Sequence, residues 1–108
     1  MTRFICCILV LASAFGSTLA AQDAGDPVRG LAYAKTSCAS CHAVDPNEDV
    51  PAIDGAPSFD QVANTPGMTS TALAVWLQTP HPNMPNFIIP SPDMDDVISY
   101  ILTLKKAK

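Results

Sequence analysis

Residues 38–42 place two cysteines three positions apart and a histidine directly after the second, as Cys38-Ala39-Ser40-Cys41-His42. This C-x-x-C-H pattern is the attachment motif of c-type haem. Cysteines at this spacing can form thioethers with two vinyl groups on one edge of a porphyrin, and the adjacent histidine is then delivered beneath the ring. The motif therefore predicts one covalent haem, attached through Cys38 and Cys41, with His42 as the proximal iron ligand.

Three other interpretations of the two cysteines are weighed against the haem. A thioredoxin-like redox pair needs a βαβ context, and the sequence shows no strand pattern of useful length. A zinc site needs four ligands, for which the chain beyond its leader offers only Cys38, Cys41, His42 and His81. A structural disulfide between Cys38 and Cys41 would close a very tight loop and would leave His42 unexplained.

The second axial ligand of the iron would come from Met68, Met84, Met94 or His81. Met84 lies within Pro80-His81-Pro82-Asn83-Met84-Pro85-Asn86-Phe87, where the prolines leave the loop few conformations to lose, so that it can hold a weak thioether on iron. Met94 falls in the first turn of a predicted helix, Met68 is expected to be a loop residue without a role, and His81 is expected to face solvent. We therefore predict Met84 as the distal ligand, with His81 or an exchangeable open site as the alternatives.

Three helices are predicted to position these residues. The first runs from Pro27 to about Cys38 with Asp26 as its cap, and the second runs from Thr69 or Ser70 to about Gln78. The segments between them, residues 44–67 and 79–92, are rich in proline and are predicted to be loops. With no alternating strand pattern in the chain, the predicted class is all-α.

The last predicted helix begins with Ser91 as its cap and Pro92 in its first turn. Aspartates follow near its positive end, and lysines lie at or just beyond its negative end. Its predicted buried face consists of Val97, Ile98, Ile101, Leu102 and Leu104, with Tyr100 at the margin.

The N-terminus has the pattern of an export signal. A positive start, Met1-Thr2-Arg3, precedes an apolar run over residues 4–15 and then a series of small residues. We predict a signal peptide over residues 1–20, followed by a single domain over residues 21–108, and hence a periplasmic location. The alternative is an uncleaved leader that anchors the protein to the cytoplasmic membrane, because residues 4–22 carry no charge.

Composition limits the remaining function classes. The chain has 108 residues, 48% of them hydrophobic, which fits one small folded domain and excludes an intrinsically disordered chain. The formal net charge is −4, and no basic stripe is present that could neutralise phosphates, so no nucleic-acid partner is expected. No segment after the leader is long and apolar enough to span a membrane.

Taken together, the sequence resembles the class I monohaem cytochromes c, in particular the small bacterial periplasmic type. Four features match in order over residues 26–105: Gly30, the motif at residues 38–42, Met84-Pro85, and Tyr100-Ile101-Leu102. The resemblance implies three main helices with proline-rich loops wrapped around one covalent haem. It also implies that the first and last helices cross closely at Gly30, with Val97 and Tyr100 packing from the last helix.

The resemblance assigns roles to three further residues. The carbonyl of Pro57 would accept a hydrogen bond from Nδ1–H of His42, which would orient the proximal ligand. Phe59 would cover the haem ring, with packing in the core as the alternative. Trp76 would shield the haem or reach a propionate, with anchoring of the middle helix in the core as the alternative.

The function implied is electron transfer by a carrier rather than catalysis by an enzyme. Its redox partners would carry a basic docking patch, since the chain has too few lysines to build the positive ring seen in mitochondrial members of the family. The alternatives are a cytochrome subunit of a periplasmic dehydrogenase, and a gas-sensing or peroxidase haem protein with an open iron.

Overall fold

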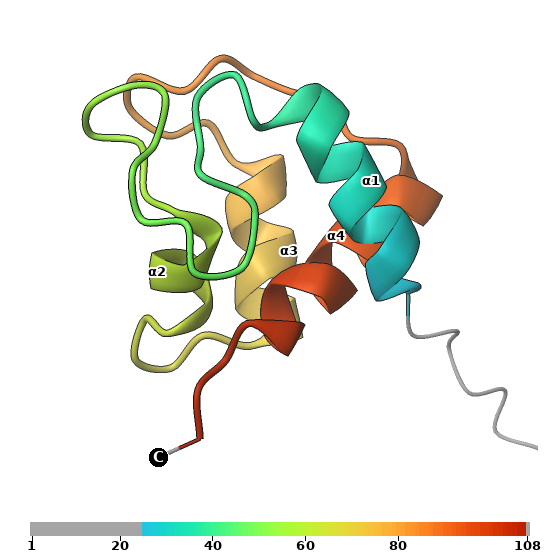
Figure 1. Cartoon of the computed structure of the whole chain (residues 1–108). Coiled ribbons are helices and arrows are strands. Elements are labelled where there is room, and N and C mark those ends of the chain that lie inside the picture. The colour runs from blue at the N-terminus through green and yellow to red at the C-terminus, as the bar shows by residue number, and fades with distance from the viewer. Residues whose placement is uncertain (1–24, 108) are drawn as a thin grey trace, which may run out of the picture.

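The computed structural model describes residues 25–107, which form helices joined by long loops (Figure 1). The helices are α1 (Pro27–Ser37), α2 (Phe59–Ala63), α3 (Ser70–Gln78) and α4 (Ser91–Thr103). Residues 25–107 contain no strand, and none of their helices is long and apolar enough to cross a membrane. The predicted signal peptide, residues 1–20, lies outside the described residues.

Side-chain caps begin α1 and α3 where the sequence predicts them. The carboxylate of Asp26 accepts hydrogen bonds from the backbone N–H groups of Val28 and Arg29. The hydroxyl of Thr69 accepts one from the N–H of Ala72, at 3.1 Å. Each cap satisfies N–H groups that lack a partner within the helix, so both predicted starts are confirmed.

The prediction of a continuous loop over residues 44–67 is wrong, because α2 lies within it. Ser58 and Gln61 form a capping box: the N–H of Gln61 donates to the Ser58 hydroxyl at 3.1 Å, and the N–H of Ser58 donates to the Gln61 side chain at 2.9 Å. The helix has only five residues, too few for a hydrophobic period to become visible.

Two predictions for α4 also need correction. The position before the helix is occupied by Pro90, and Ser91 is the first helical residue and makes no capping hydrogen bond. Tyr100 is buried rather than marginal, at 4% exposure, and its hydroxyl donates to the carbonyl of Val44 at 2.6 Å. This hydrogen bond fixes the loop after the cysteine motif to α4.

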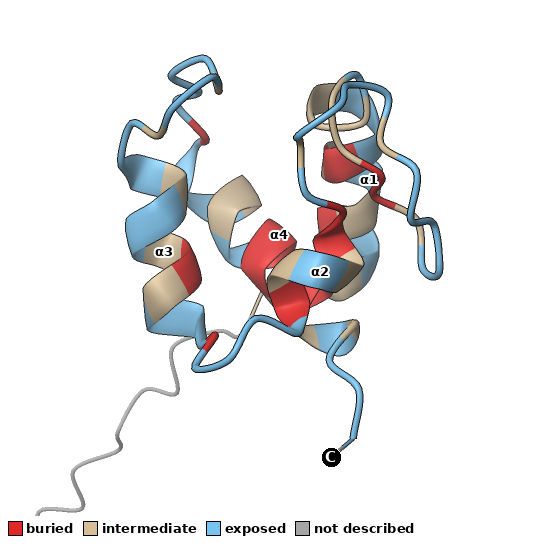
Figure 2. Ribbon diagram, turned by 90° about the vertical axis from the view of Figure 1, so that its left-hand side faces the viewer, coloured by how far each residue is buried: buried red, intermediate tan, exposed pale blue. Residues whose placement is uncertain are grey.

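The centre of the fold is the crossing of α1 and α4 (Figures 1 and 2). At Gly30, an added Cβ would lie 2.0 Å from the carbonyl oxygen of Asp96 and 2.9 Å from Cβ of Tyr100. Only glycine permits this approach of the two backbones, so the predicted close crossing at Gly30 is confirmed. Figure 2 shows the buried residues gathered on α4 and on the parts of α1 and α3 that face it.

An ion pair between the exposed Arg29 and the buried Asp96 joins α1 to α4 beside the crossing. Asp96, on α4, is almost fully buried and accepts hydrogen bonds from Nε and Nη2 of Arg29 at 2.7 and 2.9 Å, and from the N–H of Asp26 at 2.6 Å. These donors hold the pKa of Asp96 below its ordinary value, first through the Arg29 guanidinium and then through the backbone of Asp26. Asp26 therefore caps α1 and also joins it to α4.

Candidate functional site

His42 lies directly after the second cysteine and is held in one orientation. Its Nδ1 is 2.7 Å from the carbonyl oxygen of Pro57. Because a carbonyl only accepts hydrogen bonds, Nδ1 carries the proton and Nε2 carries a free lone pair. A neutral imidazole in this tautomer is the form that binds a metal, and the carbonyl partner fixes the orientation of the ring.

The start of α2 positions that carbonyl. Ser58, fully buried, caps the helix directly after Pro57, and the N–H of the next residue, Phe59, donates to the carbonyl of Ala43 at 2.9 Å. Two hydrogen bonds thus join residues 42–43 to residues 57–59. His42 donates to the carbonyl of Pro57, and the N–H of Phe59 donates to the carbonyl of Ala43. The short helix that the sequence did not reveal is therefore the element that orients the histidine.

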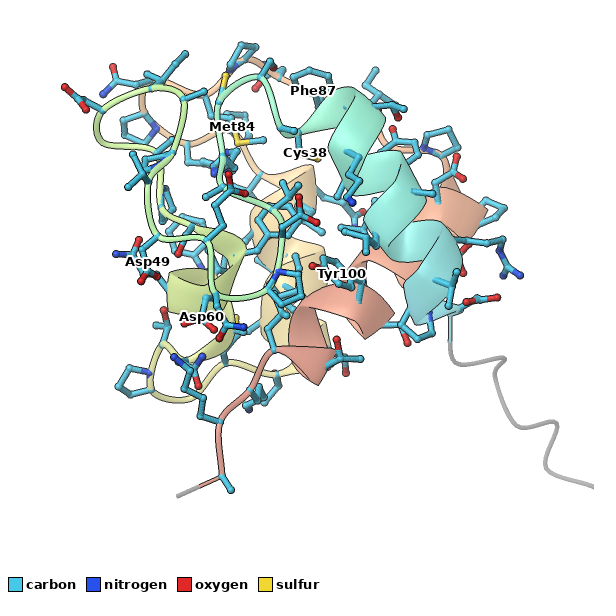
Figure 3. The ribbon with its side chains drawn as sticks, in the orientation of Figure 1. Cys38, Asp49, Asp60, Met84, Phe87 and Tyr100 are labelled. Carbon is cyan, nitrogen blue, oxygen red and sulfur yellow. The ribbon has the colours of Figure 1, made fainter. Side chains whose placement is uncertain are left out.

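His42 faces a cavity of about 450 Å³ whose lining is mostly apolar. The cavity lies between the end of α1, α2 with the loops on either side of it, α3, the loop before α4, and α4 itself. Its lining brings together the residues expected to bind haem: Cys38, Cys41, His42, Pro57, Phe59, Trp76 and Met84. In Figure 3, Cys38 and Met84 lie at the same end of the molecule as Phe87, whereas Tyr100 lies at the crossing of α1 and α4.

The two cysteines are free thiols, and Cys38 is unsuited to disulfide exchange. Burial, and to a lesser degree the neighbouring Cys41, raises the pKa of Cys38 to about 11. Exchange requires a thiolate, and redox-active C-x-x-C pairs have a lowered pKa instead. The environment of Cys38 is therefore the reverse of the one that a thioredoxin-like pair needs.

Phe59 and Trp76 make different contacts with this site. Phe59 is buried in the core and also lies beside the cavity, with its ring centroid 5.9 Å from that of His42 and 6.4 Å from that of Tyr100. Trp76 is 56% exposed, so it is not the core anchor of α3, a role that the fully buried Leu73 fills instead. The indole of Trp76 lies at the cavity.

His81 does not simply face solvent, as the sequence suggested, but lines the cavity beside Met84. Its Nε2 is 2.7 Å from Sδ of Met84, and its Nδ1 is 2.9 Å from the carbonyl oxygen of Thr79. The ring of Trp76 meets it edge to face, with centroids 5.5 Å apart. No residue pattern distinguishes this arrangement from a solvent-facing loop histidine, because it depends on how residues 79–84 turn.

The other methionines are placed differently. Met68, expected to be a loop residue without a role, is buried in the core and lines the cavity, and its carbonyl accepts a hydrogen bond from Nζ of Lys105 at 2.7 Å. Met94 is half-buried and packs against the core. Met84 thus belongs to the loop that covers the cavity, whereas Met68 belongs to the packed interior.

The donor groups at this cavity fit a covalently attached haem. Two free cysteines can form thioethers, an imidazole lone pair can bind iron, and a methionine sulfur lies on another part of the same lining. The apolar lining suits a large apolar ring. The fold brings these donor groups to one cavity from two parts of the chain, residues 38–42 and the loop that carries Met84.

Comparison with known proteins agrees with this geometry. The family model described as Cytochrome c matches residues 28–105. Cytochrome c-552 of Bradyrhizobium diazoefficiens is 43% identical to this chain over 103 residues, which cover 95% of this chain and 94% of the relative. No solved structure gives a significant match. Since the family model spans both the cysteine motif and the cavity, and the relative aligns along almost the whole chain, the chain belongs to the cytochrome c family and is a haem electron-transfer protein rather than an enzyme.

Proposed function

We propose that this protein is a periplasmic electron carrier whose haem iron is bound by His42 on one side and Met84 on the other. Family membership implies the covalent c-type haem, and Cys38 and Cys41 are the cysteines proposed to attach it. The observation that carries the proposal is the cavity onto which all four residues open. When bound, the haem supplies one-electron chemistry between ferric and ferrous iron.

The protein side chains would keep both iron ligands in place while the electron moves. Pro57 would fix His42 through the hydrogen bond at Nδ1, so that the neutral imidazole carries its proton on Nδ1 and presents the lone pair of Nε2 to the iron. Met84 lies between Pro82 and Pro85, and the prolines restrict the loop. A thioether ligand favours the ferrous form and so raises the reduction potential. Fixed ligands also keep the structural change between the two oxidation states small.

The surface around the cavity is apolar and acidic. Ile53, Trp76 and Phe87 line the cavity and are about half exposed, and Asp54 is the one charged residue among the described lining residues. The basic side chains of the described chain are engaged elsewhere: Arg29 with Asp26 and Asp96, Lys35 with Asp45, Lys105 with the Met68 carbonyl, and Lys106 with Asp60. We therefore propose redox partners that present a basic patch beside their own redox centre.

The periplasmic location that we propose requires export of the protein, which we propose as well. A signal peptide over residues 1–20 would leave a cytochrome c domain that begins at Ala21. Without cleavage, the same leader would hold the domain at the cytoplasmic membrane. Both forms would place the domain in the periplasm, the compartment proposed for its redox partners.

Two other functions use the same cavity. A permanent subunit of a periplasmic dehydrogenase would use the same apolar rim as a carrier. An open-iron sensor or peroxidase would need groups that bind or activate a small ligand. Among the described lining residues there is no arginine, and His81 is the only imidazole besides His42. We favour the carrier because the methionine-bearing loop covers the cavity.

The absorption spectrum of the holoprotein tests the ligand assignment. We expect the oxidised protein to be low-spin and to show the weak long-wavelength band that marks methionine on ferric iron. Met84→Ala should abolish this band, and Met94→Ala, a matched change outside the cavity, should retain it. A band that persists in Met84→Ala, or a high-spin wild-type protein that binds carbon monoxide on reduction, would contradict the proposal.

A further inference from the structure

The loop over Met84 contains an imidazole arranged in the same way as the proximal one. His42 and His81 each have Nδ1 within hydrogen-bond distance of a backbone carbonyl, from Pro57 at 2.7 Å and from Thr79 at 2.9 Å. Both side chains line the same cavity. These are the only two histidines in the chain.

The hydrogen bond at Nδ1 determines what Nε2 of His81 can do. The Thr79 carbonyl accepts a proton and cannot give one, so in the neutral imidazole Nδ1 is protonated and Nε2 has a lone pair. That lone pair lies 2.7 Å from Sδ of Met84. Neither atom can then donate a hydrogen bond to the other. The contact therefore brings two potential metal ligands to one place.

Local contacts hold His81 at that place. Its carbonyl accepts a hydrogen bond from the N–H of Met84 at 3.3 Å, which closes a tight turn. Asn83 supplies the left-handed conformation of this turn, with φ of 66°, which asparagine tolerates better than most residues. The edge-to-face contact with Trp76 supports the imidazole from α3. His81 and Met84 thus sit on one small and rigid unit.

From this geometry we propose that His81 is a reserve distal ligand, which binds the iron when the sulfur of Met84 is lost. The inference rests on the proposed ligation by His42 and Met84. In the exchange, the iron–sulfur bond breaks and an iron–nitrogen bond to Nε2 forms. One neutral lone pair replaces another, so no electron or proton is transferred. The result is an iron that stays six-coordinate and closed to small ligands even without its methionine.

The test compares the holoproteins of Met84→Ala, His81→Phe and the double variant Met84→Ala/His81→Phe. Phenylalanine keeps an aromatic ring against Trp76 and removes the lone pair. We expect Met84→Ala to lose the methionine band but remain low-spin, with a lower reduction potential because imidazole replaces the thioether. The double variant should become high-spin, and His81→Phe alone should keep the methionine band, which shows that the loop is intact.

Added imidazole provides the second measurement. If His81 occupies the iron in Met84→Ala for more than nine-tenths of the time, the double variant should bind imidazole at least about tenfold more tightly than Met84→Ala. Conversion of the double variant to low-spin by imidazole also shows that it is folded around an accessible iron. A high-spin Met84→Ala protein, or a double variant that stays low-spin, would overturn the reserve role. A wild-type protein without the methionine band would instead overturn the assignment of Met84.

Discussion

Pro57 acts on the site through its backbone carbonyl oxygen, so its effect does not depend on a side-chain functional group. The hydrogen bond from His42 determines which nitrogen of the neutral imidazole is protonated.

The carboxylate of Asp96 also depends on hydrogen bonds, in this case in the interior of the fold. Its carboxylate is buried with three donors around it, so its charge is tolerated only while Arg29 and the Asp26 backbone remain in place.

Acid should remove the contribution of Asp96 to stability. Its pKa in the folded protein lies below 3.8, the ordinary value, chiefly because Arg29 donates hydrogen bonds to the carboxylate. A group with a lowered pKa stabilises the fold at pH values above its ordinary pKa, and this stabilisation disappears as the pH falls through the folded-state value. We expect Asp96→Asn to lower the free energy of unfolding at neutral pH, and the deficit to shrink on acidification below 3.8.

Denaturant unfolding of both holoproteins at a series of pH values measures this effect. Asp95→Asn is the matched control, because Asp95 is an exposed neighbour on the same helix and should cost little at any pH. A deficit of Asp96→Asn that does not change between neutral and acid pH would mean that the carboxylate charge contributes nothing.

The contact of α1 with α4 depends on backbone proximity rather than on large side chains. The carbonyl of Asp96 occupies the space that a side chain at residue 30 would need. The same stretch of α4 carries Val97 and Ile101, which are buried in the core. A change in the spacing of the two helices therefore reaches the core and, through Tyr100 and Val44, the loop after His42.

Gly30→Ala should destabilise the protein although alanine is the better helix former. The gain in helix propensity is about 1 kcal/mol, whereas overpacking of a tight contact costs about 1–3 kcal/mol or more. With Cβ at 2.0 Å from a backbone oxygen, the clash cannot be relieved by a side-chain rotation. Thermal unfolding of the holoprotein should show a lower midpoint.

Ala32→Gly in the same helix serves as the control, because Ala32 is exposed and only propensity operates there. It should cost about 1 kcal/mol. If Gly30→Ala were as stable as the wild type, the two helices would have to be further apart than the structure places them.

Local chemistry explains which elements the sequence could predict. Asp26 with Pro27, and Thr69, satisfy helix N–H groups through bonds within a few residues, so their pattern is visible in the sequence. The motif at residues 38–42 is equally local. The pair of Asp96 with Arg29 is separated by 67 positions, and the approach of His81 to Met84 depends on the path of the loop. Such contacts follow from the fold and have no pattern of their own.

The charge of the molecule is acidic as a whole, with a formal net charge of −4. Composition reveals this net charge but not how the basic side chains are placed. In the described residues, they form ion pairs with carboxylates or donate to a carbonyl away from the cavity. The cavity rim is left with apolar groups and Asp54. A positively charged partner is therefore attracted over a distance, and the apolar rim is available for close contact.

Oxidation of the reduced protein by small inorganic oxidants should reveal this field. With the cationic oxidant tris(1,10-phenanthroline)cobalt(III), the rate should fall several-fold as the Debye length decreases from about 30 Å at about 0.01 M salt to about 8 Å at about 0.15 M. With anionic ferricyanide the rate should rise with salt instead. Stopped-flow absorbance follows both reactions.

Asp54→Asn should reduce the salt dependence with the cationic oxidant, whereas Asp93→Asn, which changes the same charge away from the cavity lining, should reduce it less. Equal salt dependence for the two oxidants would show that electron exchange does not occur through an acidic surface.

The crossing of α1 and α4 also sets the order in which the chain can fold. The bonds between Arg29 and Asp96 span 67 positions, so closing them encloses most of the domain in one loop, which makes folding non-local and slow compared with a simple hairpin of helices. A polypeptide that emerges with its N-terminus first contains α1 and the cysteine motif long before α4 exists to bury them. Cys38 and Cys41 therefore remain accessible until α4 has been made, which leaves an interval in which haem can be attached before the helices close.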